Sequence, residues 1–250
     1  MQIPATSAPF TPEGDTIRAV HLPGDGPLAV YLHGLGCHGA ASWAGFAVLR
    51  GRPALLVDLP GHGRSDGPAA FSYTLPDLAR AVASLLDAQG QQSFEIFGHS
   101  LGGSVAIHLA DRRPDLVDRL VLVEPAMDPA PVRPGDIAAT YEHELDHGGW
   151  ERILEREAEW RRADVKLTTP IALVRCARGL ADAHAAETSS RLLRLPASVL
   201  LVTGEQRTYL DEARFADHGI GSERLLGAGH FVMLDRPREL LARVDPPARG

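Results

Sequence analysis

The most constraining feature of this 250-residue chain is the segment from Phe94 to Ala110, where an apolar run passes through a glycine-rich turn into a helical run. The turn reads Gly-His-Ser-Leu-Gly-Gly and centres on Ser100. A Gly-x-Ser-x-Gly sequence has little specificity alone, but between a strand and a helix it favours a nucleophile elbow, a strained turn that raises the serine hydroxyl above a sheet. Gly98 and Gly102 are expected to leave room where the strand and the helix pass close together. The segment therefore predicts an α/β fold with Ser100 as a nucleophile.

Two other segments suit the same chemistry. An apolar run over residues 28–32 ends in His-Gly-Leu-Gly at residues 33–36, where the amide of Leu35 is placed to supply half of an oxyanion hole. The second amide is that of Leu101, directly after the serine. Near the C-terminus, His230 follows a strand candidate and a glycine-rich turn, a loop position from which a general base reaches the serine. We therefore expect His230 to be the base.

These motifs, with Asp-Leu-Pro-Gly-His-Gly-Arg-Ser-Asp at residues 58–66, occur in an order and spacing that resembles the α/β-hydrolase superfamily over nearly the whole chain. The resemblance implies a mostly parallel, eight-stranded sheet flanked by helices, with a small helical cap inserted after the sixth strand. It implies cleavage of an ester-like bond (carboxylic ester, lactone or thioester) or of an activated C–C bond, without a cofactor. The expected core comprises residues 1–125 and 196–250, and the expected cap comprises residues 126–195.

The apolar patterning favours the same fold, because continuous apolar strands between helices indicate a parallel sheet covered on both faces. Strands are expected at Thr16–Leu22, Leu28–Leu32, Ala54–Asp58, Phe94–Phe97, Arg119–Glu124, Ser198–Thr203 and Glu223–Leu226, and helices at Leu75–Gln89 and Leu101–Arg112. Residues 126–195 break this alternation and read as helices only. Their apolar stripes are Ile137, Tyr141 and Leu145, and then Trp150, Ile153, Leu154 and Arg161. This segment is expected to lie over the active site as a lid.

Relatives in this superfamily use a catalytic triad of a nucleophile, a histidine and an acid, and the position of the acid in this chain departs from the usual family pattern. Relatives usually carry an aspartate a few residues after the seventh strand, and this chain has Arg207 there. A subset of the superfamily carries the acid at the end of the sixth strand instead, where this chain has Glu124. The resemblance therefore makes Glu124 the first choice, with Glu205 and Asp211 as alternatives. A surface carboxylate at the entrance of the cap is the other role open to Glu124.

One motif indicates a rival chemistry. Residues 143–147 read His-Glu-Leu-Asp-His and match H-E-x-x-H, the helical zinc motif of metalloproteases. His143 and His147 fall off the apolar stripe of their segment, and no third ligand follows at the usual spacing. A chance match on a solvated face is favoured, so no metal site is expected.

Several polar and aromatic residues near these motifs have structural interpretations. His62 and His99 are expected to shape loops rather than to transfer protons, and Asp58 is expected to be a turn carboxylate. Whether the following aromatic residues line a substrate pocket or pack in the interior is left open: Trp43, Tyr141, Trp150, Trp160 and Phe231.

Composition limits the partners. A net charge of −7 argues against a nucleic-acid partner, which a basic patch would indicate.

Cys37 and Cys176 are too few for a disulfide framework and are expected to be free thiols. The N-terminus lacks a signal-peptide pattern, and no run reaches the roughly 18 apolar residues of a membrane span. A cytoplasmic enzyme with a small-molecule substrate and no membrane partner is expected, and the oligomeric state is not predicted.

The predicted function is a serine hydrolase that works by two-step acyl transfer through Ser100. A serine nucleophile argues against dehalogenase and epoxide hydrolase chemistry, which need a carboxylate. Two alternatives stay open. One is a C–C bond hydrolase with the same triad. The other is a small-molecule-binding protein of the same fold with little or no turnover, and Arg207 at the position usual for the acid is the feature that favours it.

Overall fold

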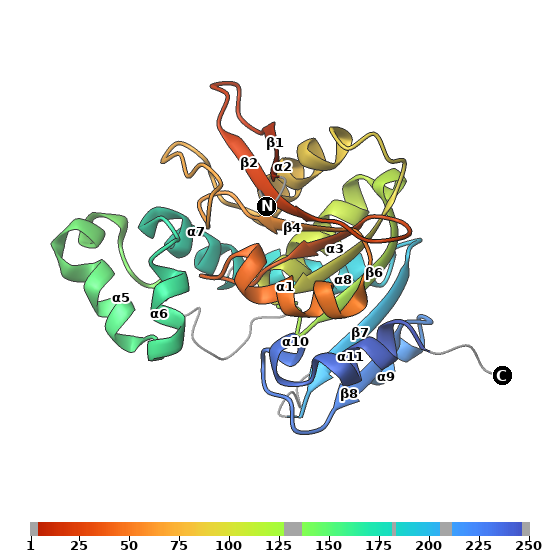
Figure 1. The fold of residues 1–250 in the computed structure, drawn as a ribbon. Coiled ribbons are helices and arrows are strands. Elements are labelled where there is room, and N and C mark those ends of the chain that lie inside the picture. The colour runs from red at the N-terminus through yellow and green to blue at the C-terminus, as the bar shows by residue number, and fades with distance from the viewer. Residues whose placement is uncertain (1–4, 128–136, 182–183, 206–211, 247–250) are drawn as a thin grey trace.

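The computed structural model describes residues 5–127, 137–181, 184–205 and 212–246. Their strands form one eight-stranded sheet in the order β1-β2-β4-β3-β5-β6-β7-β8 (Figure 1). The strands are β1 (Ala5–Pro9), β2 (Thr16–Leu22), β3 (Ala29–Leu32), β4 (Ala54–Asp58), β5 (Phe94–His99), β6 (Val117–Val123), β7 (Ser198–Gly204) and β8 (Gly221–Leu225). β2 runs antiparallel to its neighbours β1 and β4, and every pairing from β4 to β8 is parallel. The predicted mostly parallel, eight-stranded sheet is confirmed.

The edge strand β1 was not among the strands expected from the sequence. Its residues, Ala-Thr-Ser-Ala-Pro, lack the β-branched and aromatic alternation that marks a strand, and most of them are exposed. Only the ladder with β2, in which Ala5 pairs with Val20, makes this segment a strand. An edge strand can be polar because one of its sides faces solvent.

Helices cover both faces of the sheet (Figure 1). The helices are α1 (Gly39–Arg50), α2 (Leu75–Asp87), α3 (Leu101–Arg112), α5 (Trp150–Arg156), α6 (Glu159–Val165), α7 (Pro170–Ala181), α8 (His184–Leu192), α9 (Glu212–Ala216), α10 (Val232–Asp235) and α11 (Pro237–Val244). Short helical turns are η1 (Pro114–Leu116), η2 (Glu142–Glu144) and the single π-turn η3 (Leu145–Gly149). α3 packs between α2 and α8, whereas α1 packs with α10 and α11. None of the helices in the described part of the chain is long and apolar enough to cross a membrane.

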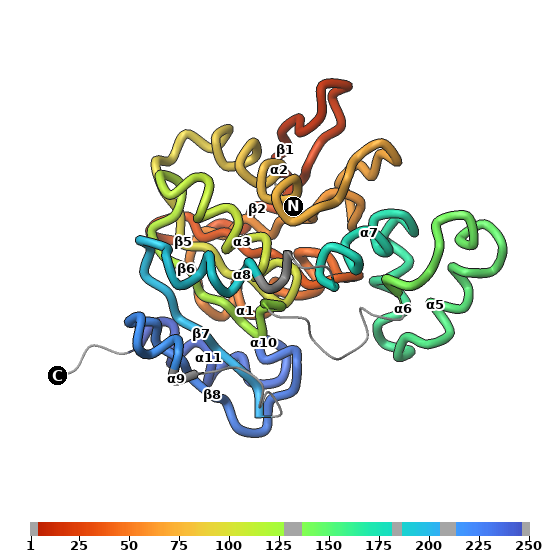
Figure 2. The backbone as a smooth tube through the Cα atoms, turned by 180° about the vertical axis from the view of Figure 1, so that it is seen from behind, coloured from red at the N-terminus to blue at the C-terminus, as the bar shows by residue number. Residues whose placement is uncertain are grey.

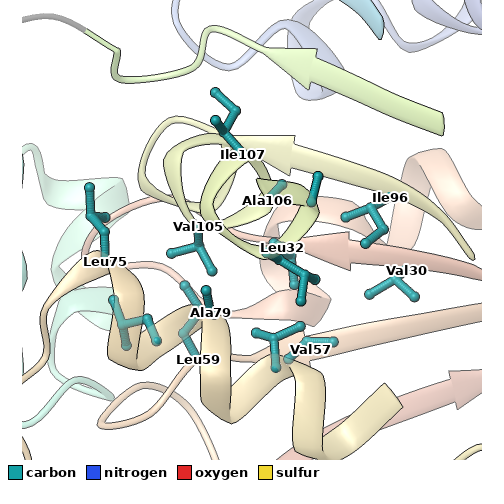
Figure 3. Packing of buried hydrophobic residues seen from close by; sticks show 14 of the residues in the cluster. Val30, Leu32, Val57, Leu59, Leu75, Ala79, Ile96, Val105, Ala106 and Ile107 are labelled. Atoms are coloured by element: carbon teal, nitrogen blue, oxygen red, sulfur yellow. The ribbon is translucent and has the colours of Figure 1, made fainter. Parts of the chain in front are cut away.

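The core lies in two apolar layers, one on each face of the sheet. Figure 3 shows the layer under α2 and α3, where Val30, Leu32 and Ile96 from the strands face Ala79 and Val105 from the helices. β3 and β4 consist entirely of buried residues because helices cover both of their faces. This rigid centre supports the carboxyl ends of the parallel strands.

The predicted cap segment contains η2, η3 and α5 to α8. Figures 1 and 2 show α5 and α6 to one side of the sheet, whereas α8 packs against the core helix α3. The segment has a small apolar cluster of its own, formed by Leu145, Ile153, Val165, Leu173 and Val174. A short backbone pairing joins the segment to the core. Gly63 N–H donates to Leu167 O at 2.9 Å, and Thr169 N–H donates to Gly61 O at 2.8 Å.

The single apolar stripe expected over Ile137, Tyr141 and Leu145 is wrong. Tyr141 is 64% exposed, and the chain there is a 3-10 turn followed by a π-turn instead of one α-helix. The helical path is interrupted at His147 and at Gly148, where φ is +83°. Gly148 permits this break, but the break comes after the stripe. The stripe itself fails because Tyr141 has an extended backbone, with φ −75° and ψ 142°, which the apolar spacing did not reveal.

Candidate functional site

Ser100 lies at the turn between β5, which ends at His99, and α3, which begins at Leu101. Its backbone has φ +49° and ψ −115°, a strained conformation for a residue with a side chain. The neighbouring glycines permit the turn sterically. A Cβ on Gly98 would lie 2.6 Å from Gly102 O, and one on Gly102 would lie 2.5 Å from Leu32 O. The expected close passage of strand and helix is confirmed.

Glu124 and His230, the expected acid and base, are brought together from positions 106 residues apart. The distance from His230 Nδ1 to Glu124 Oε2 is 3.2 Å. A carboxylate only accepts, so Nδ1 carries the proton, and Nε2 of neutral His230 is left as the acceptor. The other carboxylate oxygen, Oε1, accepts the Gly204 N–H at 2.7 Å. Glu124 is 5% exposed, so its carboxylate is held in a largely dry environment.

Backbone strain concentrates at these positions. Within the described ranges, three residues other than glycine have positive φ, and two of them are Ser100 and Glu124, both at +49°. Each directly follows a parallel strand, β5 or β6. Strained conformations persist only where the surrounding structure determines them, and they cluster at functional sites.

The loop that carries His230 is held by side chains from three directions. His99 Nε2–H donates to His230 O at 2.9 Å. Glu205 Oε2 accepts the Gly227 N–H, and Asp235 Oδ2 accepts the Gly229 N–H, both at 2.8 Å. Glu205 therefore binds the loop backbone and not the imidazole. The other alternative acid, Asp211, and Arg207 lie outside the described residues.

The loop with Leu35 lies against the elbow, since a Cβ on Gly34 would be 3.3 Å from Ser100 Cβ. Among the described residues, neither the Leu35 N–H nor the Leu101 N–H has a hydrogen-bond partner. The Leu101 amide belongs to the first turn of α3, where free N–H groups and the helix dipole favour negative charge. Two unpaired amides thus flank the serine.

Three histidines beside the site are buried and neutral. Burial lowers the pKa of His33 to about 4 and that of His62 to about 3. Burial likewise holds the pKa of His99 well below its usual value. His33 accepts the Leu59 N–H through Nε2 at 3.0 Å and donates through Nδ1 to Gly34 O at 2.8 Å, so its tautomer is determined. These contacts agree with the expectation that His62 and His99 shape loops.

Asp58 accepts the backbone N–H groups of Gly39 and Arg64, as expected of a turn carboxylate. Cys37 and Cys176 are buried free thiols. The H-E-x-x-H match falls on η2 and η3, where the helical path ends at His147, whose Nδ1 lies 2.8 Å from His143 O. In the described part of the chain, no group of three or more metal-ligating side chains comes together.

The aromatic residues divide into two groups. Trp43 is fully buried and donates from Nε1 to Leu32 O at 3.0 Å, so it is a core residue. Trp160 of α6 is 59% exposed, and its ring meets that of Phe231 edge-on at 5.2 Å. Because Phe231 follows His230, this contact brings the predicted cap segment to the rim of the site.

Two contributors to the site were missed or misread in the sequence. Asp235, which holds the His230 loop, lies six residues beyond Gly229 in no recognisable motif. Arg161 was interpreted as one member of an apolar stripe, but its guanidinium donates to Leu35 O at 3.2 Å. An arginine within an apolar stripe is the one signal that could have marked it.

Comparisons with known proteins agree with this architecture. A family model described as "Alpha/beta hydrolase family" matches residues 29–244. Lipase LipV of Mycobacterium tuberculosis is 45% identical over 104 residues, which cover 41% of this chain and 39% of the lipase. A pimeloyl-acyl-carrier-protein methyl ester esterase of Chromobacterium violaceum is 44% identical over 101 residues, 40% of this chain and 37% of the esterase. This chain thus matches less than two fifths of either relative.

Solved structures match over nearly the whole chain. An esterase from Exiguobacterium antarcticum superposes with a TM-score of 0.76 at 19% identity, over 96% of this chain and 97% of the esterase. The structure of E-2-(acetamidomethylene)succinate hydrolase superposes with a TM-score of 0.73 at 22% identity, over 97% and 98% of the two chains. At these identities the likeness establishes the fold.

Proposed function

The chain belongs to the α/β-hydrolase family, and on that premise we propose that it is a serine hydrolase that cleaves an ester-like bond of a small molecule through an acyl-enzyme on Ser100. The observation that carries the proposal is the hydrogen bond between His230 Nδ1 and buried Glu124, next to a serine in the strained elbow conformation. The curated relatives named as lipase and methyl ester esterase support an ester as the bond cleaved. We assign the base to His230 and the acid to Glu124.

In the proposed reaction, His230 Nε2 takes the proton of Ser100 as the serine oxygen attacks the substrate carbonyl carbon. The carbonyl oxygen becomes an oxyanion, which the N–H groups of Leu35 and Leu101 stabilise. His230 then gives its proton to the leaving group, and the acyl-enzyme forms. Water attacks the acyl-enzyme with His230 as base again, which releases the acid and restores Ser100. Glu124 keeps the imidazole in the required tautomer and stabilises the imidazolium.

The Ser100 to His230 contact is the step that substrate binding must complete. Within the described chain, no hydrogen bond joins Ser100 to His230, although the His230 ring lies 4.7 Å from the ring of His99, the residue before the serine. Catalytic hydrogen bonds are often long in the absence of substrate.

We also propose residues 126–195 as the cap over this site and residues 1–125 and 196–250 as the hydrolase core. No metal or organic cofactor takes part in the proposed reaction.

Ser100→Ala tests the proposal. With p-nitrophenyl acetate and butyrate as substrates, we expect kcat to fall at least roughly a thousand-fold, because the variant loses the nucleophile but keeps the oxyanion amides. Circular dichroism and the urea midpoint check that the fold is kept. An active-site phosphonate is expected to label Ser100 of the wild-type protein in peptide mass spectra and to leave the Ala variant unlabelled.

Two outcomes would contradict this function. A Ser100→Ala variant that keeps more than a few per cent of the wild-type kcat would exclude the acyl-enzyme. A wild-type protein that binds the ester substrates or their acids tightly, turns none of them over and is not labelled would support the small-molecule-binding alternative.

A further inference from the structure

Arg161 of the predicted cap segment contacts the core on both sides of the proposed site. Its side chain is 17% exposed. On one side Nη2 donates to Leu35 O at 3.2 Å, and Nη1 lies 3.6 Å from Cys37 Sγ. On the other side the guanidinium carbon lies 5.5 Å from the ring centre of Phe231, the residue after the proposed base. The remaining donor, Nε, is engaged by Glu157 Oε2 at 2.8 Å, which directs the guanidinium toward the core.

The loop that Arg161 reaches carries the Leu35 amide, and the backbone of Leu35 is held by the peptide units on its two sides. The Gly34–Leu35 unit is held from within the core, because Gly34 O accepts from Cys37 N at 3.2 Å and from His33 Nδ1 at 2.8 Å. The peptide is planar and trans, so these contacts direct the Leu35 N–H to the opposite side. The next unit, Leu35–Gly36, is held through Leu35 O, which accepts from Arg161 Nη2 at 3.2 Å and more weakly from the thiol of Cys37 at 3.7 Å.

This second anchor is needed because the loop can rotate there. Gly36 has φ +65°, a left-handed conformation that glycine enters and leaves at little cost. The space beside Gly36 is filled by Arg161 and by Leu173 and Val165 of the predicted cap, all within 3.3 Å of where a Cβ would lie. The Leu35 side chain also packs against the apolar cluster of that segment. Removing Arg161 would leave the second peptide unit without a charged hydrogen-bond donor.

We propose that Arg161 is a positioning residue, which orders the oxyanion loop from the cap and so makes the docked cap a condition for catalysis. The inference rests on the proposed function, because it concerns the same oxyanion hole. Arg161 transfers no proton and is not required to contact the substrate. Its contribution is to restrict the Leu35 backbone before the oxyanion forms, and preorganised donors of this kind contribute strongly in a site that excludes water.

Arg161→Ala and Arg162→Ala form a matched pair for the test. Arg162 is the next residue of α6, is exposed, and donates to the carbonyl oxygens of Glu157 and Glu155 within the cap segment. With neutral p-nitrophenyl butyrate, we expect Arg161→Ala to lower kcat by about a hundred-fold, the lower end of the effect of removing one oxyanion donor. KM should change little, and Arg162→Ala should leave both constants near their wild-type values.

Two further measurements distinguish positioning from general damage. The Ki of a boronic acid that forms a tetrahedral adduct on Ser100 should rise in Arg161→Ala in parallel with the loss of kcat/KM. Hydrogen exchange of a peptide that covers residues 33–38 should become faster, while exchange in the cap helices α5 and α7 stays unchanged.

The inference is overturned if Arg161→Ala keeps the wild-type kcat, or if Arg162→Ala loses as much activity. It is also overturned if the loss lies in KM and is confined to anionic esters, because Arg161 would then bind substrate. The exchange measurement does not depend on turnover. If the wild-type protein hydrolyses no ester, the proposed function fails, while unchanged exchange at residues 33–38 would reject the ordering role by itself.

Discussion

At the scale of single residues, the position of the acid is decided by how two parallel strands end. β6 and β7 are paired in parallel, with Val123 opposite Val202, so the residues that follow both strands lie at the same edge of the sheet. Glu124 therefore lies beside Gly204, whose N–H it accepts, and its second oxygen faces His230. Glu205, after the neighbouring strand, holds the loop at Gly227 instead. The two carboxylates have different partners although both lie near the proposed base.

This difference predicts opposite results for two similar substitutions. In Glu124→Gln, the amide oxygen can still accept the Gly204 N–H, but the amide NH₂ then faces His230 Nδ1. The imidazole must present its unprotonated nitrogen to that group, so Nε2 keeps its proton and cannot take one from Ser100. We expect kcat on p-nitrophenyl butyrate to fall by up to roughly ten-thousand-fold with the fold intact.

Glu205→Gln is the matched control, since its amide oxygen can replace the carboxylate as acceptor for Gly227. Its kcat should stay within a few-fold of wild type. A neutral Glu124→Gln together with a severely impaired Glu205→Gln or Asp211→Asn would assign the acid to the region after β7.

At the scale of elements, the elbow depends on close contacts between backbone atoms of α3 and of the segment at the end of β3. A clash there cannot be relieved by rotating a side chain. Gly102, in the first turn of α3, passes the end of β3, and a Cβ there would lie 2.5 Å from Leu32 O and 2.6 Å from His33 O. Both contacts are with backbone atoms, one at the last residue of β3, whose residues are all buried, and one at the residue that follows it. The position of α3, and with it the strained turn at Ser100, therefore requires the absence of a side chain at residue 102.

We predict that Gly102→Ala lowers the free energy of unfolding by about 1–3 kcal/mol or more, because the helix must move away from the strand. The contrasting variant is Gly45→Ala. Gly45 is exposed in the middle of α1 and has no atom within 4 Å of where a Cβ would lie. There alanine should stabilise the protein by about 0.5–1 kcal/mol. Urea unfolding curves measure both values, and equal effects of the two variants would contradict the steric interpretation.

At the scale of the whole molecule, buried neutral histidines couple stability to pH. His33 and His62 are fully buried with ring centres 5.0 Å apart, and burial lowers their pKa values to about 4 and about 3. In the unfolded chain a histidine takes up a proton near pH 6.5. Below that pH the unfolded state binds protons that the folded state does not, so stability falls as the pH falls from about 6.5 toward these lowered values.

We therefore predict that the free energy of unfolding decreases by several kcal/mol between pH 7.5 and pH 4.5, since each unit of lowered pKa corresponds to about 1.4 kcal/mol. His62→Phe should flatten this dependence, because it removes one titrating group. Ser65→Ala, which removes a non-titrating neighbour that donates to Asp58 O, should shift the curve downward without changing its slope. Urea midpoints across the pH range test this, and an unchanged slope in His62→Phe would count against it.

The features that the sequence determined by itself are those that depend on local patterning. The apolar runs predicted seven of the eight strands to within about two residues, and the glycines around Ser100 predicted the elbow, because burial and close backbone approach restrict residue types position by position. The weak points were also local in origin. β1 is too polar to be recognised, and Tyr141 has an extended backbone within a segment whose apolar spacing indicated a helix.

Only the tertiary structure decided which distant groups meet. Glu124 and His230 are 106 residues apart, and the sequence left three carboxylates as candidates for the acid. Arg161 and Leu35 are 126 residues apart, and no spacing rule connects them. Such contacts follow from which strands are neighbours in the sheet and from where the cap segment docks. These are properties of the packed chain as a whole, because a long-range contact does not produce a periodic sequence pattern in the residues between its two partners.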